Sequence, residues 1–424
     1  MRHVYRFTRT PELAGATLTV TSRGPLVTVW PRGYRSLRAV FLSVVYFFWL
    51  NVIRPIDVSP EGNLYSLYIP PVPSGPQERM IESFLRKWLL ADPAPMAATI
   101  AVTTRCQYSC AHCSAAGLEG RRELDAAELR RAVAGCLDLG VQVLTLTGGE
   151  PLLRDDLEEL VASVPHDMAT TLVFTNAHGL DEKRARALRA AGLFGVHVSL
   201  DSPDPATHDR LRGCEGAFAR VERGVRAALD AGLKVGLSTY ATHASVAAGD
   251  LTRLAALAHR WGVHEVTVFD AIPTGRLLHD RDLRLTPEDH LAVIREARRA
   301  TRRHHRRPRV VSQSWTNSPR SFAKYIGCLG AGFQVHVTAH GDVTPCDFTP
   351  LSFGNLRDEP LETIWKRMTA HHEYCRHRIP CRMQDPAFRA RYVDTIPEGA
   401  PLPYPIAELD RAAEGGGAEA SFSA

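Results

Sequence analysis

Three cysteines lie close together in the sequence, at a spacing that suits a metal centre. Cys106, Cys110 and Cys113 form a C-x3-C-x2-C pattern directly after an apolar stretch. Their thiolates can face one metal centre from a single loop. Structural zinc sites usually have four protein ligands, whereas three cysteines on a four-iron cluster leave one iron open. The pattern therefore favours an iron–sulfur cluster with an open position, and a structural zinc or a set of buried thiols is the alternative.

A second motif follows the next apolar stretch. It reads Thr147-Gly148-Gly149-Glu150-Pro151. Paired glycines let the backbone approach a ligand closely, and a glutamate can accept hydrogen bonds from an ammonium group. The motif is therefore a candidate binding site for an amine.

The elements that must position these motifs alternate between strands and helices. We expect strands at Ala98–Thr104, Val141–Thr147, Ala169–Thr175, Gly195–Leu200, Lys234–Tyr240 and His264–Phe269. We expect helices at Ala126–Leu139, Leu157–Val164, Glu182–Ala191, Phe218–Ala231 and Val246–Trp261. The alternation predicts an α/β fold with a parallel sheet. Six strands are too few to close an eight-stranded barrel, so we expect an open or partial barrel with both motifs at the C-terminal ends of strands.

Together, the two motifs resemble those of the radical S-adenosylmethionine (radical SAM) enzymes. The resemblance implies a partial, TIM-like (β/α)6 barrel. It implies that the three cysteines hold a [4Fe–4S] cluster and that Gly148, Gly149 and Glu150 contact the methionine amine of SAM. Further SAM contacts are implied, less specifically, at His112, Ser199, Asp201 and Arg212. Ser199 and Asp201 could equally be strand-end caps, and Arg212 a surface residue.

The chemistry implied by this family begins with reductive cleavage of SAM. The resulting 5′-deoxyadenosyl radical abstracts hydrogen from a C–H bond, here of a peptide or small-molecule substrate, and an electron donor such as flavodoxin or ferredoxin is needed. A lipid or other membrane-associated substrate is an alternative. A protein whose clusters only relay electrons is another, but a relay needs no methionine pocket.

A second group of cysteines follows at Cys328, Cys346, Cys375 and Cys381. The spacing Cys328-x12-Gly341-x4-Cys346 resembles the SPASM and twitch extensions of radical SAM enzymes, in a shortened form. Four thiolates are enough to close one cubane, so we expect one auxiliary [4Fe–4S] cluster; a zinc site or an open-iron cluster is the alternative. Asp347 directly follows Cys346, as in anaerobic sulfatase-maturating enzymes, which implies a proton acceptor during oxidation. A turn or helix cap is the structural alternative for Asp347.

The rest of the chain divides around these sites. We expect an N-terminal region (1–96), the barrel (97–280), a basic helix and connection (281–324), a small α+β cluster domain (325–385) and a C-terminal tail (386–424). The N-terminal region contains Ala39–Ile53, an apolar segment with arginines on both sides. At 15 residues it is short for a membrane span, which needs about 20. It could be a buried helix or strand pair, or an anchor at a membrane surface.

Composition limits the remaining possibilities. The chain has 424 residues, nine cysteines and a formal net charge of +5. An odd number of clustered cysteines in a chain this long does not indicate a disulfide framework. We expect a cytoplasmic protein, peripheral to a membrane if residues 39–53 anchor it. Nucleic-acid binders usually carry a larger or better localised basic excess, so we expect no nucleic-acid partner.

Overall fold

The computed structural model describes residues 1–8, 10–92, 94–118, 120–305, 307–317, 327–375 and 381–419. For Arg281 and residues 413–419 it describes the backbone alone. Parts of the expected segments 281–324, 325–385 and 386–424 therefore lie outside the described residues.

The main sheet of the described chain runs in the order β12-β11-β10-β9-β8-β7-β6-β13-β14. The six expected strands are β6 Ala97–Thr103, β7 Val143–Gly148, β8 Thr170–Thr175, β9 Gly195–Ser199, β10 Lys234–Ala241 and β11 Glu265–Asp270. They are parallel neighbours in chain order. A further strand, β12 Arg309–Ser312, pairs in parallel with β11. This arrangement confirms the α/β class and the partial barrel.

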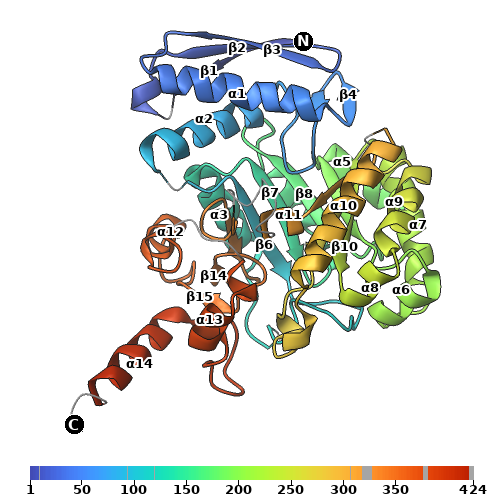
Figure 1. Ribbon diagram of the computed structural model, residues 1–424, viewed down its shortest axis with the longest axis vertical. Coiled ribbons are helices and arrows are strands. Elements are labelled where there is room, and N and C mark those ends of the chain that lie inside the picture. Colours follow the sequence, from blue (N-terminus) through green and yellow to red (C-terminus); the bar gives the residue numbers. More distant parts are fainter. Residues whose placement is uncertain are drawn as a thin grey trace.

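Helices cover the outer face of this sheet (Figure 1). They are α3 Ala126–Leu139, α4 Leu157–Ala162, α5 Glu182–Ala190, α6 Pro205–Arg212, α7 Ala217–Asp230, α8 His243–Ala247, α9 Asp250–Arg260 and α10 Pro287–Arg303. The single helix expected at Val246–Trp261 is wrong, because the chain breaks there into α8 and α9. Gly249 precedes α9 with a φ of 66°, a left-handed conformation that glycine adopts readily.

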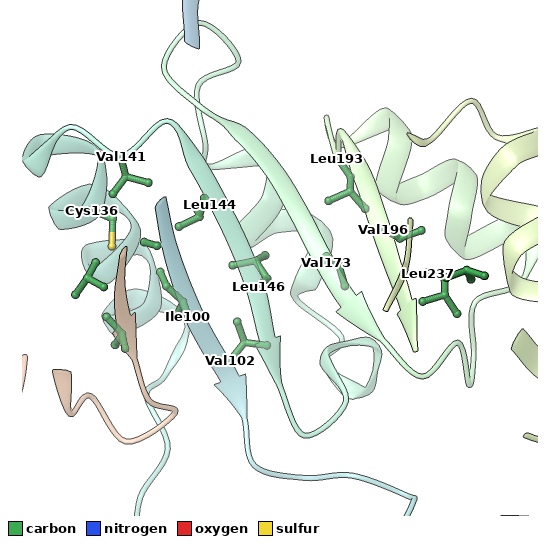
Figure 2. Close-up of a cluster of buried hydrophobic side chains, with 14 of the residues drawn as sticks. Ile100, Val102, Cys136, Val141, Leu144, Leu146, Val173, Leu193, Val196 and Leu237 are labelled. Atoms are coloured by element: carbon green, nitrogen blue, oxygen red, sulfur yellow. The ribbon is translucent and has the colours of Figure 1, made fainter. Parts of the chain in front are cut away.

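Apolar side chains between the strands and these helices form the core. Figure 2 shows Ile100, Val102, Leu144 and Leu146 projecting toward the helices, with Cys136 of α3 among them. Cys136 is fully buried, and burial raises its pKa to about 12. It is therefore a core side chain, in keeping with the general tendency of free cysteines to be buried as small apolar residues.

The C-terminal extension continues the sheet of the barrel. β13 Gln334–Val337 pairs in parallel with β6, and β14 Val343–Thr344 pairs with β13 in the antiparallel direction. The other elements of this part are α11 Ser314–Asn317, β15 Leu351–Ser352, α12 Leu361–Ala370, α13 Pro386–Phe388, a π-helix Arg389–Val393, β16 Tyr404–Pro405 and α14 Ile406–Glu419. The extension thus lies directly beside the strand that leads into the first cysteine motif.

The N-terminal region is a small α/β layer at the other end of the barrel (Figure 1). Its elements are β1 Arg2–Arg6, β2 Thr17–Arg23, β3 Leu26–Arg32, α1 Leu37–Ile53, β4 Asp57–Ser59, β5 Gly62–Leu64 and α2 Gly75–Leu90. The hairpin of β2 and β3 turns at Gly24-Pro25.

Polar contacts join this layer to the starts of barrel strands. Lys234 pairs with Asp57 at 2.6 Å, and Arg309 donates to the carbonyls of Ile53 and Arg54. The Leu67 amide donates to buried Glu265 at 3.3 Å. The layer therefore covers the N-terminal ends of the strands and leaves their C-terminal ends free.

Candidate active site

A cavity of about 560 Å³ opens at the C-terminal ends of the barrel strands. Residues from both sequence motifs line it: Cys106, Cys110, Cys113, Gly148 and Gly149. His112, Ser199, Asp201, Arg212 and Asp347 also line it. The structure therefore brings together, in one cavity, residues that lie more than 240 positions apart in the chain.

The cysteine loop is held by barrel residues on both sides. The Ala111 amide donates to the Leu211 carbonyl at 2.9 Å, and the Arg276 amide donates to the Cys113 carbonyl at 2.9 Å. Hydrogen-bond donors also face two of the sulfurs: Asn176 Nδ2 lies 3.7 Å from Cys106 Sγ, and Arg212 Nη1 lies 3.7 Å from Cys110 Sγ. Burial raises the pKa of the Cys106 and Cys110 thiols. Donors near sulfur stabilise thiolates in iron–sulfur sites, so the loop suits a cluster.

The two glycines allow the second motif to press against the cysteine loop. The Gly149 amide donates to the Thr103 carbonyl at 2.7 Å, and the Glu150 amide to the Arg105 carbonyl at 2.8 Å. Gly148 has a φ of 134°, and a Cβ on Gly149 would collide with the Arg105 carbonyl. Only residues without a side chain fit this approach.

Glu150 lies behind the cavity wall and is fully buried. Its carboxylate accepts hydrogen bonds from Thr175 Oγ1 at 2.7 Å, the Asn176 amide at 2.7 Å and the Leu152 amide at 3.0 Å. Burial raises the pKa of Glu150 to about 7, despite these donors. In this structure the side chain holds the end of β8 in place, beside the glycines that line the cavity.

Asp201 and Arg212 form a buried ion pair in the cavity wall. Arg212 Nη2 donates to Asp201 Oδ1 at 2.8 Å, and Nε lies 2.6 Å from Oδ2. Burial alone would raise the pKa of Asp201. The opposite effect of Arg212 and His112 is larger, so the net shift of the pKa is downward. The resemblance alone suggested SAM contacts at these two residues; the structure shows each already paired with the other.

His112 lies between this pair and Tyr240. Its ring stacks on Tyr240 with the ring centres 4.1 Å apart, and Nε2 lies 3.4 Å from Asp201 Oδ2. Its Nδ1 is buried without a hydrogen-bond partner among the described residues. Burial lowers the pKa of His112. His112 and Tyr240 thus form an aromatic wall, and the imidazole nitrogen of His112 can accept or donate a hydrogen bond. Such a wall suits a flat polar ring such as adenine.

Ser199, Asn176 and Tyr240 come from the ends of three neighbouring strands or the residues just after them. Ser199 Oγ lies 3.4 Å from Ser238 Oγ and faces the cavity. Asn176 and Tyr240 were not among the site residues predicted from the sequence. Their signal was present, since polar or aromatic residues at the C-terminal ends of barrel strands are typical of active sites.

Three phenylalanines and the acid Asp347 also line the cavity. The phenylalanine rings form a row with Phe269 in the middle. The ring centre of Phe269 lies 6.2 Å from that of Phe174 and 5.9 Å from that of Phe348. Asp347 lies beside them. Its Oδ1 accepts hydrogen bonds from Gln334 Nε2 at 2.6 Å and Thr99 Oγ1 at 3.3 Å. No hydrogen bond reaches Oδ2 from the part of the chain that the structure describes.

Two cysteines of the second group, Cys328 and Cys375, line a separate hollow of about 310 Å³. A hydrogen bond from the Cys381 thiol lowers the pKa of Cys328, and burial raises the pKa of Cys346 to about 12. Cys328, Cys346 and Cys381 thus interact closely, whereas Cys375 is exposed and lies on the rim of the same hollow. Buried Arg382 adds positive charge near Cys328. Three thiols that shift one another's pKa, with a fourth on the rim of the hollow, suit a cluster that binds at least three cysteines.

Known protein families match both parts of the site. The radical SAM superfamily model matches residues 100–246, and the SPASM model, described as an iron–sulfur cluster-binding domain, matches residues 328–388. A GTP 3′,8-cyclase from Erythrobacter litoralis is 32% identical over 264 residues, which cover 58% of this chain and 77% of the cyclase. The chain belongs to the radical SAM superfamily.

Two further comparisons extend this result. An AdoMet-dependent heme synthase from Nitratidesulfovibrio vulgaris is 28% identical over 299 residues, covering 66% of this chain and 81% of the synthase. The crystal structure of Streptococcus suis SuiB bound to its precursor peptide SuiA has the same fold, with a TM-score of 0.54 at 16% identity, covering 70% of this chain and 71% of SuiB. The protein is therefore a radical SAM enzyme with a C-terminal iron–sulfur cluster-binding domain.

The residues of this radical SAM enzyme fit the cofactors that the family requires. Three thiols on one loop, two of them facing hydrogen-bond donors, suit a [4Fe–4S] cluster. The orphaned Nδ1 of His112 and the side-chain-free surface of Gly148 and Gly149 suit a polar ligand such as SAM in the same cavity.

Proposed function

We propose that this enzyme catalyses the oxidation of a peptide or small molecule at a C–H bond, with Asp347 accepting the proton. The observation that carries the proposal is the set of residues that line one cavity. The three cysteines, the two glycines and Asp347 all line it, and no hydrogen bond from the described residues reaches Oδ2 of Asp347.

When bound, the first cluster and SAM supply a 5′-deoxyadenosyl radical that removes a hydrogen atom, and the second cluster supplies an acceptor for the electron that follows. The residues of the chain position the substrate. Phe174, Phe269 and Phe348 offer an apolar surface that excludes water from the C–H bond. Thr99 and Gln334 fix one oxygen of Asp347, a residue that lines the cavity, and leave the other available for a proton. Loss of an electron acidifies the substrate, and a fixed carboxylate nearby can then take its proton.

The substrate class rests on the relatives. One relative is a heme synthase, and SuiB was crystallised with a precursor peptide. A cavity of this size accepts either a peptide side chain or a small molecule. A lipid substrate is less well supported, because the exposed apolar residues of the N-terminal region lie at the opposite end of the barrel from the cavity.

The first test asks for SAM cleavage. Anaerobically reconstituted protein should convert SAM to 5′-deoxyadenosine when dithionite is added, and Cys106→Ala should not. A protein with full iron content that cleaves no SAM, with or without candidate substrates, would support an electron-relay function instead.

The second test addresses Asp347. Synthetic peptides and small metabolites can be screened for compounds that accelerate 5′-deoxyadenosine formation by the normal enzyme. With such a compound, Asp347→Asn should still cleave SAM, but it should form the oxidised product at least about 100-fold more slowly than the normal enzyme. Equal product formation by both proteins would remove Asp347 from the reaction. Ser352→Ala, outside the cavity lining, serves as the control.

A further inference from the structure

Helix α1 exposes an apolar face along its full length. Leu37, Phe41 and Phe48 are 88%, 65% and 68% exposed. The other exposed apolar residues of this helix are Val44, Val45, Trp49 and Val52. Residues spaced by three and four positions share one side of a helix, so these seven form a continuous stripe, which we call the α1 face. Exposed apolar patches of this extent usually mark an interaction surface.

The opposite side of α1 is packed. Ala39, Ser43, Phe47 and Leu50 are buried against the three-stranded sheet and α2. Apart from Arg38 near its start and Asn51 near its end, the helix is therefore largely apolar around its circumference, although the described protein covers only one side of it. Elsewhere exposed large apolar residues are few: among the described residues, only Leu329 lies beyond position 90. The apolar exposure belongs to this layer and is not a general property of the surface.

The charged residues of the segment that contains the α1 face have one sign. Residues 13–56 contain Arg23, Arg32, Arg35, Arg38 and Arg54 and no aspartate or glutamate. The segment thus carries a charge of +5, equal to that of the whole chain. All five arginines are exposed, and no carboxylate of the described residues forms an ion pair with any of them. Apolar and aromatic residues flanked by arginines complement an anionic lipid surface.

More positive charge lies at the same end of the barrel. Exposed Arg302 and Arg303 end α10, a few residues before Arg309, which contacts the carbonyls at the end of α1. These arginines add to the field that attracts an anionic surface over about 10 Å.

A peptide strand is a poorer occupant of this layer. The outer edge of β3 is blocked, because Asn51 hydrogen-bonds both the amide and the carbonyl of Val27. Alternation along the strand places Val29 and Pro31 on the same edge, and proline has no amide to donate. On the edge of β1, the Arg6 amide donates to Glu78 of α2 at 2.5 Å. Neither edge offers a continuous row of backbone partners.

We propose that the α1 face and its flanking arginines dock this enzyme on an anionic lipid bilayer. No helix in the described part of the chain is long and apolar enough to cross a bilayer, so α1 lies along the lipid surface with its packed side toward the protein. Because the N-terminal layer covers the starts of the barrel strands, docking turns the cavity away from the lipid. Docking is thus independent of the proposed oxidation.

The experiment is vesicle sedimentation with the full reconstituted chain. Vesicles of phosphatidylglycerol and phosphatidylcholine in equal amounts are compared with vesicles of phosphatidylcholine alone. The protein should sediment with the anionic vesicles, and less of it should do so as salt is raised. Arg35→Glu with Arg38→Glu should weaken binding by about 20-fold or more, since each arginine near an anionic surface changes partitioning roughly fivefold.

Matched variants separate docking from damage to the fold. Arg223→Glu with Arg226→Glu, on α7, changes net charge by the same amount at another surface and should bind nearly as the normal protein does. Phe48→Ser should weaken binding roughly tenfold, whereas Leu90→Ser at the end of α2 should not. All four should retain SAM cleavage.

Three results would overturn the proposal. They are no sedimentation with either vesicle, sedimentation unchanged by Phe48→Ser, and equal losses from the α1 and α7 charge variants. A dimer in analytical ultracentrifugation that dissociates on Phe48→Ser, without vesicle binding, would assign the α1 face to a second copy of the chain.

Discussion

Arg212 links the wall of the cavity to the cysteine loop through Asp201. Two of its nitrogens contact the Asp201 carboxylate at 2.8 Å and 2.6 Å, and the third lies 3.7 Å from Cys110 Sγ. Asp201 follows β9 and Arg212 ends α6, so one guanidinium group joins two barrel units to a candidate cluster ligand.

Breaking this ion pair should destabilise the protein and the first cluster together. Asp201→Asn and Arg212→Met each leave a buried partner unpaired, which costs about 3–5 kcal/mol. The double variant should lose less than the sum of the two. Unfolding midpoints and iron content, measured under nitrogen, check both effects. Exposed Arg210→Met is the control, and additive single effects would show that the two residues act separately.

Gly149→Ala should remove the first cluster and leave the auxiliary one. A Cβ at Gly149 would collide with the Arg105 carbonyl and press on Thr104, in the backbone that leads to Cys106. We expect iron to fall to about half of the normal value and SAM binding to be lost. Gly135→Ala in α3, where the Cβ would meet Leu361 at an ordinary 3.4 Å, should keep full iron. Full iron and SAM affinity in Gly149→Ala would contradict the close packing of the two motifs.

The auxiliary cysteines should not contribute equally. The normal chain should bind about eight iron atoms, as two cubanes require. Cys346→Ala removes a half-buried member of the group of three and should lower this number to about four. Cys375→Ala removes only the exposed thiol at the rim, so the cluster should form but lose iron faster to EDTA. Identical loss of iron in both variants would indicate that all four thiolates are required.

Buried Glu265 should make stability fall as pH rises. Burial at the base of the barrel raises its pKa to about 7, whereas a glutamate in the unfolded chain titrates near 4.3. Between these values the unfolded chain releases the proton and the folded protein keeps it, so raising the pH favours unfolding. From pH 5.5 to 8 the loss should be about 2 kcal/mol.

Glu265→Gln isolates this contribution from that of Glu150, which has the same sign. The unfolding midpoint of Glu265→Gln should depend less on pH than that of the normal protein, and exposed Glu398→Gln should behave as the normal protein does. Parallel pH profiles for Glu265→Gln and the normal protein would show that Glu265 is ionised in the fold.

The repeated barrel units could be predicted from sequence because each is local. Apolar stretches of strand length, each followed by a helical pattern and a glycine or proline, place β6 to β11 within two residues of their observed bounds. The prediction failed at Val246–Trp261, where the apolar spacing continues through a break that depends on the conformation of Gly249.

The sequence by itself determined the chemistry of this protein, because the cysteine loop and the glycine pair each lie within a few residues. Tertiary structure alone decided what surrounds them. The pairing of β13 with β6 carries Asp347 into the cavity, Arg212 turns inward to Asp201, and packing of the N-terminal sheet leaves one side of α1 bare. The physical reason is that each of these depends on segments far apart in the chain, whose contacts no local pattern records.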